Sequence, residues 1–238
     1  MDDHLTCDIL IIGCGIAGSA AALRAAQDER VRICVISHAE EPQESNTYYA
    51  QGGIIHRGPE DSPELLAADL TRAGDRLNNP PAVDLLAHKG PQLLQELLIE
   101  GLQVPFARTP TGELEHIREA AHSTARILHV GDSTGRAIEE RLIAALRERP
   151  NVLLLSAHTA VDLLTPAHHS RNRLAVYDPL SCVGAYVFDQ KQGRVVPILA
   201  RKTILATGGL GRIFLHTTNP PGARGDGLAM AYRAGARI

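Results

Sequence analysis

Residues 7–18, near the start of the chain, are the strongest indication of its fold; they read Cys7-Asp8-Ile9-Leu10-Ile11-Ile12-Gly13-Cys14-Gly15-Ile16-Ala17-Gly18. Its first half, residues 7–12, is the apolar run expected of a strand that is buried on both faces. Residues 16–27 are rich in alanine and leucine and long enough for a helix, and residues 31–36 form a second β-branched run. A strand, a glycine turn, a helix and a strand within about 30 residues predict a βαβ unit with parallel strands.

The glycines of this run have the spacing of a dinucleotide-binding turn. Gly13 allows the tight turn after the strand, Gly15 lets a pyrophosphate approach the backbone, and Gly18 lets the helix pack closely on the strand. The N-terminus of the helix then offers unpaired N–H groups and a favourable dipole to the phosphates. We therefore expect the nucleotide to contact the whole loop: Gly13, Cys14, Gly15, Ile16, Ala17 and Gly18. The alternative is a glycine turn that serves only to reverse the chain.

The rest of the chain predicts an α/β fold. Helices are indicated by apolar residues at helical spacing in residues 63–73, 81–100 and 135–147. Strands are indicated by short apolar runs at residues 152–156, 174–177, 183–188, 195–199 and 203–206, with Gln192-Gly193 as a hairpin turn. We expect one Rossmann-like domain over residues 1–238, with a parallel sheet and an inserted antiparallel β-meander at about residues 174–200.

Composition excludes several classes of partner. The chain has 238 residues, and its 27 acidic and 24 basic side chains leave a formal net charge of −3. This mildly acidic balance, with no basic tract, argues against nucleic acid and against an anionic membrane as partners. The longest uncharged stretch, residues 9–23, is shorter than the roughly 20 residues that a membrane helix needs. The four cysteines form no CxxC pair and no metal-site spacing, so we expect reduced thiols, a cytoplasmic protein and no metal.

The position that usually recognises the ribose carries no carboxylate. About 20 residues beyond the glycines, an acidic residue usually binds the ribose hydroxyls. Here the second predicted strand ends in Ser37-His38. This weakens the prediction of a nicotinamide-dependent dehydrogenase.

A second loop resembles a known family. Residues 45–53, Ser45-Asn46-Thr47-Tyr48-Tyr49-Ala50-Gln51-Gly52-Gly53, are similar to the flavin loop of the fumarate reductase/succinate dehydrogenase flavoproteins. The resemblance continues in family order through residues 69–75, 126–129, 132–136, 206–209, 218–220 and 225–227. The same family has serine and lysine where this chain has Ser37-His38, so the missing acid fits.

The resemblance implies FAD as the cofactor. Besides the glycine loop, it places the cofactor against His38, Asn46, Thr47, Tyr48, Tyr49, Ala50, Gln51, Gly52, Gly53, Thr159, Ala160, Gly208, Gly209 and Asp226. Respiratory members of the family attach the flavin covalently through a histidine, where this chain has Asn46. An amide forms no such bond, so we expect non-covalent FAD.

A third loop indicates the substrate class. Residues 117–123, Ile117-Arg118-Glu119-Ala120-Ala121-His122-Ser123, are similar to the branch of the family that oxidises aspartate. Fumarate reductases place phenylalanine where Glu119 stands, and a carboxylate there pairs with the ammonium group of an α-amino acid. The resemblance therefore implies Glu119 and His122 as substrate-binding residues. Ala120-Ala121 replace a Gly-Gly of the family, so a positive φ there would cost stability.

The activity implied by the resemblance is oxidation of L-aspartate to iminoaspartate, with a hydride passing to flavin N5 and O2 or fumarate as the electron acceptor. This reaction would feed quinolinate and NAD biosynthesis, with quinolinate synthase as the partner that consumes the product. Two alternatives stay open. One is a soluble fumarate reductase or succinate dehydrogenase-like flavoprotein, and the other is an FAD-binding fragment without catalysis.

The family also has parts that these residues do not include. Its capping domain and a later segment follow the part matched here, and its motif Gln-Phe-His-Pro-Thr would come after Ile238. We therefore expect a truncated chain in which the capping domain is absent. The arginine that serves the family as catalytic acid and base is expected beyond Ile238, so no catalytic residue is assigned in this chain. Arg126 and Arg136 are expected to make structural ion pairs.

Overall fold

The computed structural model describes residues 4–238, which form two compact units. The first unit comprises the residues up to Tyr48 together with Leu142–Ile238, and the second comprises Tyr49–Arg141. Among residues 4–238, no helix has the length and apolar character needed to cross a membrane.

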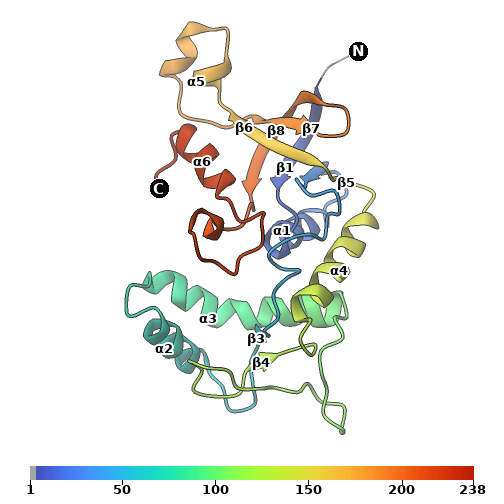
Figure 1. Ribbon diagram of the computed structural model, residues 1–238, viewed down its shortest axis with the longest axis vertical. Coiled ribbons are helices and arrows are strands. Elements are labelled where there is room, and N and C mark those ends of the chain that lie inside the picture. Colours follow the sequence, from blue (N-terminus) through green and yellow to red (C-terminus); the bar gives the residue numbers. More distant parts are fainter. Residues whose placement is uncertain (1–3) are drawn as a thin grey trace. The chain divides into compact units, whose positions relative to one another are not determined.

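A six-stranded sheet forms the core of the first unit (Figure 1). Its strands lie in the order β5-β2-β1-β8-β7-β6, and their bounds are β1 (Leu5–Ile12), β2 (Ile33–Ile36), β5 (Val152–Leu155), β6 (His158–Leu164), β7 (Gly184–Asp189) and β8 (Arg194–Leu205). β1 pairs in parallel with β2 and β8, and β2 pairs in parallel with β5. β8, β7 and β6 pair antiparallel. The expected α/β fold is therefore confirmed, and the meander extends the parallel sheet rather than forming a separate one.

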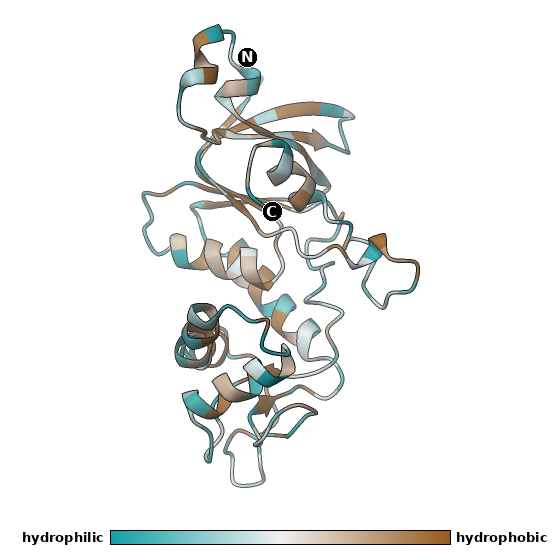
Figure 2. Cartoon of the chain, turned by 90° about the vertical axis from the view of Figure 1, so that its left-hand side faces the viewer, coloured by the Kyte–Doolittle hydropathy of each residue, from teal (hydrophilic) through white to brown (hydrophobic). Residues whose placement is uncertain are grey.

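Apolar layers lie on both faces of this sheet. The buried side chain of Leu10 belongs to a cluster that includes Met230 of α6 (Asp226–Arg233). Ile11, the next residue of β1, is fully buried and points to the opposite face because side chains alternate along a strand. α1 (Ile16–Ala25) packs against β1 and β2. The strands accordingly carry mainly hydrophobic colours in Figure 2.

One strand predicted for the meander is wrong. Residues 174–177 lie in a 3₁₀ helix, Arg173–Tyr177, that follows the short helix α5 (Pro166–His169). The side chains of Leu174, Val176 and Tyr177 are exposed, so this apolar run does not pair with the sheet.

The third strand of the meander is β6, which the sequence did not indicate. The meander therefore runs from His158 to Leu205 instead of about residues 174–200, and the two runs predicted at residues 195–199 and 203–206 form the single strand β8. The hairpin at Gln192-Gly193 is confirmed, because Gly193 has a φ of 64° and its N–H donates to the Asp189 carbonyl at 2.9 Å.

The second unit contains α2 (Pro63–Ala73), α3 (Pro80–Leu94), a π-helix (Gln95–Gly101) and the short antiparallel pair of β3 (Ile54–Ile55) with β4 (Ile127–Leu128). α4 (Thr134–Arg147) begins in this unit, and its residues from Leu142 onward belong to the first unit. Ser62 and Asn79 cap α2 and α3, because their side chains accept hydrogen bonds from first-turn N–H groups. The helices predicted at residues 63–73 and 135–147 are confirmed.

The helix predicted for residues 81–100 changes type after Leu94 and continues as the π-helix. Pro91 lies inside α3 and has no N–H, so it cannot donate to the carbonyl of Ala87, four residues earlier. Arg57 replaces this donor, with Nη2 at 2.8 Å from the Ala87 oxygen.

Two glycines determine the turn between β1 and α1. Gly13 has a φ of 105°, which favours glycine, and a Cβ on it would overlap the carbonyl oxygen of Ala206. A Cβ on Gly18 would overlap the carbonyl oxygen of Gly13. The tight turn and the close packing of helix on strand, which the glycine spacing predicts, are both present.

Gly18→Ala should therefore destabilise the first unit even without any ligand. The added methyl group must displace backbone, and overpacking of this kind costs about 1–3 kcal/mol or more. The measurement is the urea midpoint of the ligand-free chain, followed by circular dichroism. Gly209→Ala is the control, because nothing lies within 4 Å of a Cβ at Gly209. Equal midpoints for the two variants would contradict the packing role of Gly18.

The second unit contains a half-buried pair of histidines. The rings of His56 and His116 are stacked with their centroids 5.3 Å apart, and Nδ1 of His56 lies 3.0 Å from Nε2 of His116. Burial lowers the pKa of His56, and the neighbouring His116 lowers it further. Burial also lowers the pKa of His116. The folded state therefore favours two neutral rings.

This pair makes stability depend on pH. Below about pH 6.5, the ordinary pKa of histidine, the unfolded chain binds more protons than the folded chain, so the free energy of unfolding should fall as the pH drops. His116→Gln should flatten this fall between about pH 7 and about pH 5.5. Urea midpoints across that range measure it, with Leu77→Gln at an exposed position (89% exposed) as the control. A variant whose midpoint parallels that of the wild type at every pH would rule out this contribution.

Candidate functional site

The carboxyl ends of β1 and β8 mark the place where a ligand is expected. From β1 the chain passes through α1 to β2 on one side, whereas β8 lies on the other side of β1. In open α/β sheets, ligands bind outside the carboxyl ends of the strands at such a reversal of order. The N–H of Ala206 donates to the Ile12 carbonyl at 2.8 Å, and the N–H of Gly13 donates to the Ile36 carbonyl at 2.9 Å. These bonds fix both strand ends where the glycine loop begins.

The N-terminus of α1 is built as an anion site. Gly15 is the N-cap residue, has an extended backbone and brings no side-chain cap to the helix. The N–H of Ile16 donates to Oγ1 of Thr47 at 3.0 Å. The next first-turn N–H groups, those of Ala17 and Gly18, have no partner within the helix. A Cβ on Gly15 would lie 3.2 Å from Thr47 Oγ1 and would narrow the approach to these groups. The absence of a side chain on Gly15 leaves this cradle of N–H groups accessible, as a diphosphate site would require.

Cys14 points away from this cradle. Its buried thiol donates to the carbonyl of Pro42 at 2.8 Å. The thiol therefore fixes the segment that leads into residues 45–48, and only the backbone of Cys14 remains for a ligand.

Several predicted cofactor residues lie together in the first unit. Asn46 Nδ2 is 3.8 Å from the position of a Cβ on Gly208, so the start of the flavin loop lies beside the turn after β8. The N–H of Gly225 donates to the Gly209 carbonyl at 3.1 Å. This bond places Asp226, the first residue of α6, next to the same turn. Asp226 itself forms an exposed ion pair with Arg224 at 2.8 Å.

His38 and Thr159, which the resemblance places near the adenosine, are joined by a residue that the sequence did not single out. Gln190 Nε2 donates to the His38 carbonyl at 2.7 Å and to Oγ1 of Thr159 at 2.9 Å. Ala160 follows on β6 at a shift of register. Gln190 lies in the hairpin after β7. Two contacts bring it to His38: β7 pairs with β6, and the N–H of His158, at the start of β6, donates to the Ser37 carbonyl at 2.8 Å.

The second half of the flavin loop, Tyr49, Ala50, Gln51, Gly52 and Gly53, belongs to the second unit. The Ala50 carbonyl accepts the N–H of Gly135 at 2.9 Å. A Cβ on Gly53 would overlap the side chain of Ile127 on β4. The N–H of Gly53 donates to Oε1 of Glu119 at 3.3 Å, so the predicted substrate residue also holds the flavin loop.

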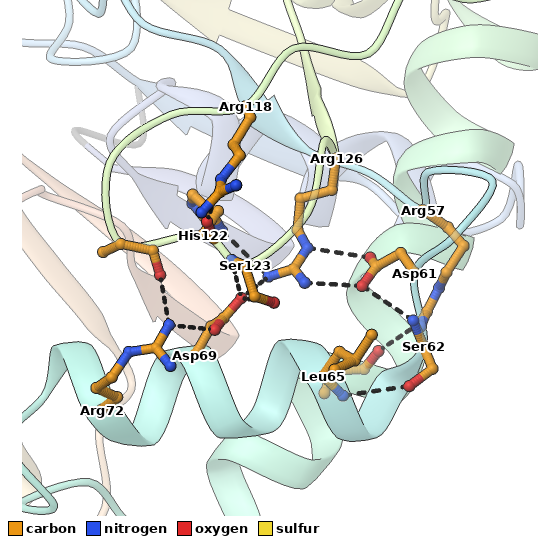
Figure 3. Close-up of polar contacts among 12 residues, drawn as sticks. Arg57, Asp61, Ser62, Leu65, Asp69, Arg72, Arg118, His122, Ser123 and Arg126 are labelled. Atoms are coloured by element: carbon orange, nitrogen blue, oxygen red, sulfur yellow. Dashed lines mark hydrogen bonds and ion pairs between the residues drawn. The ribbon is translucent and has the colours of Figure 1, made fainter.

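The predicted substrate loop is strained and anchored. Ala121 has a φ of 68°, the positive value expected where the family has glycine, at a cost of roughly 1–2 kcal/mol. Nδ1 of His122 lies 3.2 Å from Nη1 of Arg126, and the fully buried Arg126 is ion-paired with Asp61 and Asp69 (Figure 3). Arg136 pairs with Glu140 at 3.3 Å. The ion pairs expected for both arginines are confirmed.

The contact of the predicted residues with a cofactor or substrate stays a prediction.

The sequence does not indicate a role for Asp61 or Asp69, although Asp69 begins residues 69–75, one of the segments that resemble the family. Within residues 4–238, no cluster of three or more histidine, cysteine, aspartate or glutamate side chains is arranged to hold a metal ion.

Comparisons with known proteins agree on one family. Residues 8–238 match the family described as FAD binding domain. The L-aspartate oxidase of Pseudomonas aeruginosa is 39% identical over 246 residues, which cover 100% of this chain and 44% of that protein. The chloroplastic L-aspartate oxidase of Arabidopsis thaliana is 39% identical over 232 residues, covering 97% of this chain and 34% of that protein. The chain thus spans less than half the length of these relatives.

Solved structures show the same fold. The FrdA subunit of Escherichia coli quinol fumarate reductase superposes with a TM-score of 0.87 at 28% identity, over 97% of this chain and 37% of that one. Sdh1 of Mycobacterium smegmatis superposes with a TM-score of 0.83 at 26% identity, over 97% of this chain and 38% of that one.

Proposed function

Because the chain belongs to the family of FAD binding domains and FAD is its cofactor, we propose that it forms the FAD-binding part of an enzyme that oxidises L-aspartate to iminoaspartate. The observation that carries this proposal is the presence of Glu119 in the loop that anchors Gly53, in a chain 39% identical to L-aspartate oxidases. The chain covers only 44% of the relative from Pseudomonas aeruginosa, so the activity proposed is that of the whole enzyme.

Bound FAD supplies a two-electron acceptor for the hydride of the substrate. The residues of this chain bind the cofactor and orient it. The first-turn N–H groups of α1 hold the diphosphate, and the absence of a side chain on Gly15 admits it. Asn46 is an amide that cannot form a covalent link to the flavin, which supports dissociable FAD.

Glu119 recognises the ammonium group in this proposal. The side chain is exposed, and Oε1 accepts the N–H of Gly53 at 3.3 Å. Its remaining lone pairs are suited to a charge-assisted hydrogen bond from the α-ammonium of aspartate. Fumarate and succinate have no such group, so this residue separates the amino acid from the plain dicarboxylates.

The electron acceptor in the proposal is O2 or fumarate, and the consumer of the product is quinolinate synthase, which leads to NAD. The likeness to FrdA at a TM-score of 0.87 favours a second candidate, a fumarate reductase-like flavoprotein. That candidate requires flavin reduction without aspartate.

Gly15→Val should strongly weaken FAD binding. The side chain occupies the approach to the N–H groups of α1, and a loss on the order of 100-fold in affinity corresponds to about 2.7 kcal/mol. The measurement is FAD titration followed by quenching of flavin fluorescence. Arg24→Val places the same side chain at an exposed position of the same helix and should bind FAD normally. A Gly15→Val chain that retains yellow, stoichiometric FAD would contradict the cradle.

In a complete enzyme that contains residues 1–238, aspartate should bleach the flavin absorbance without air and release hydrogen peroxide in air. The L-aspartate oxidase of Pseudomonas aeruginosa, assayed alongside, supplies the reference rate. Bound FAD that aspartate leaves oxidised in the complete enzyme, while the reference is reduced, would refute the proposed activity and favour FAD binding without catalysis. Bleaching only by succinate would indicate the fumarate reductase-like candidate.

Glu119→Gln tests the charge separately from the packing in the same assay. Glutamine keeps an oxygen for the N–H of Gly53 but loses the carboxylate, so kcat/KM for aspartate should fall roughly 10- to 100-fold with FAD affinity unchanged. Glu119→Phe, which also removes the bond to Gly53, should lose more. Equal losses for aspartate oxidation and fumarate reduction would contradict the specific role of the charge.

A further inference from the structure

Arg126 is the centre of a buried polar cluster in the second unit (Figure 3). Its guanidinium donates to Asp61 through Nη2 at 2.8 Å and through Nε at 3.1 Å, and it donates to Oδ2 of Asp69 through Nη1 at 2.6 Å. Arg126 and Asp61 have no exposed side-chain surface, and Asp69 has 3%. A buried cation with two carboxylates fixes the position of every group bonded to it.

The two carboxylates differ in what else they hold. The other side-chain hydrogen bond of Asp61 comes from the N–H of Ser62, next to it in the chain. Oδ2 of Asp69, by contrast, accepts the N–H of Ser123 at 2.8 Å and the hydroxyl of Ser123 at 2.9 Å. Asp69 therefore joins α2 to the predicted substrate loop, and Asp61 does not.

A second bond from α2 reaches the strained residue of that loop. Nη2 of Arg72 donates to Oδ1 of Asp69 and to the carbonyl of Ala121 at 3.3 Å. Ala121 is the residue with a φ of 68°. A strained residue keeps its conformation only where its surroundings determine it. Asp69 and Arg72 supply that restraint from one face of one helix.

The cluster also fixes the hydrogen-bonding role of His122. Nη1 of Arg126 lies 3.2 Å from Nδ1 of His122. A guanidinium only donates hydrogen bonds, so Nδ1 must accept, and the neutral ring then carries its proton on Nε2. His122 is held further by its carbonyl, which accepts from Nε of Arg118 at 2.9 Å.

Asp69 remains a carboxylate under neutral conditions. Its burial would raise the pKa, but the hydrogen bonds from Ser123 and the charge and hydrogen bond of Arg126 outweigh this and hold the pKa of Asp69 below its usual range.

We propose that Asp69 is a positioning residue for the substrate loop: acting through Ser123 and Arg126, it presents His122 as the Nε2–H tautomer, a hydrogen-bond donor for a carboxylate of the substrate. The last step rests on the proposed function, because it requires an anionic substrate at this loop. The positioning itself requires only the residues of the second unit.

The test compares Asp69→Asn with Asp61→Asn in the 238-residue chain labelled with ¹⁵N-histidine. Each variant removes one carboxylate from Arg126, so a merely structural role predicts the same outcome for both. Long-range ¹H–¹⁵N spectra report which ring nitrogen of His122 carries the proton, and His122→Gln assigns the signal. We expect a single Nε2–H pattern in the wild type and in Asp61→Asn, and its loss in Asp69→Asn. A mixed pattern in the wild type, or identical spectra for the two variants, would overturn the proposal.

Ser123→Ala keeps the test decisive if Asp69→Asn does not fold. Ser123 is exposed, and this change removes only the hydrogen bond from its hydroxyl to Asp69. The Nε2–H signal of His122 should therefore become weaker, as it should in Asp69→Asn. An unchanged signal in Ser123→Ala would overturn the positioning role.

Titration with L-aspartate separates this inference from the proposed function. Added aspartate should shift the Nε2–H signal of His122 in the wild type and not in Asp69→Asn. A fixed tautomer that neither aspartate nor succinate shifts would leave the positioning intact and contradict the substrate assignment.

Discussion

The close approach of three backbone segments at the end of β1 is the constraint on which the first unit depends. Gly13 faces the carbonyl of Ala206, and Gly18 faces the carbonyl of Gly13, at distances that leave no room for a Cβ. Because α1 can sit this close to β1, its first-turn N–H groups open at the carboxyl end of the sheet, beside the turn that follows β8. Asn46, Gly208 and the start of α6 gather around this end as a consequence.

The sequence predicts this region well because its signals are local. The apolar run of β1, the glycines and the helical run of α1 lie within residues 5–25, and the structure confirms each of them. The strand expected at residues 174–177 failed for the opposite reason. Its apolar side chains are those of a strand, but a strand needs a neighbour, and the place beside β7 is taken by β6. β6 contains His158, Thr159 and Asp162, whose polar side chains hide the pattern, so only tertiary pairing identifies it.

The residues of the candidate site also fall into two groups, those that the sequence indicates and those that only the structure identifies. Glycines and the family-like loops were recognised from residue order, whereas Gln190 and Asp69 act through contacts between residues far apart in the chain. Gln190 reaches His38 across 152 positions, and Asp69 reaches Ser123 across 54. Neither the hydrophobic periodicity nor the spacing of motifs in the sequence predicts such hydrogen bonds. The sequence does predict that Arg126 forms ion pairs. The structure adds that one of its partners, Asp69, also anchors the predicted substrate loop through Ser123.

Backbone and side chains therefore have separate tasks in this chain. In the proposed function, cofactor binding rests on N–H groups and on the absence of side chains at glycines. FrdA, at 28% identity, superposes on this chain with a TM-score of 0.87, so the fold is kept across wide differences of sequence. Substrate choice in the proposed function rests instead on charged side chains, Glu119 and the Arg126 cluster, whose effect depends on exact placement. The strain at Ala121 is consistent with this division, since a loop held by a buried ion pair can adopt a conformation that its own residues disfavour.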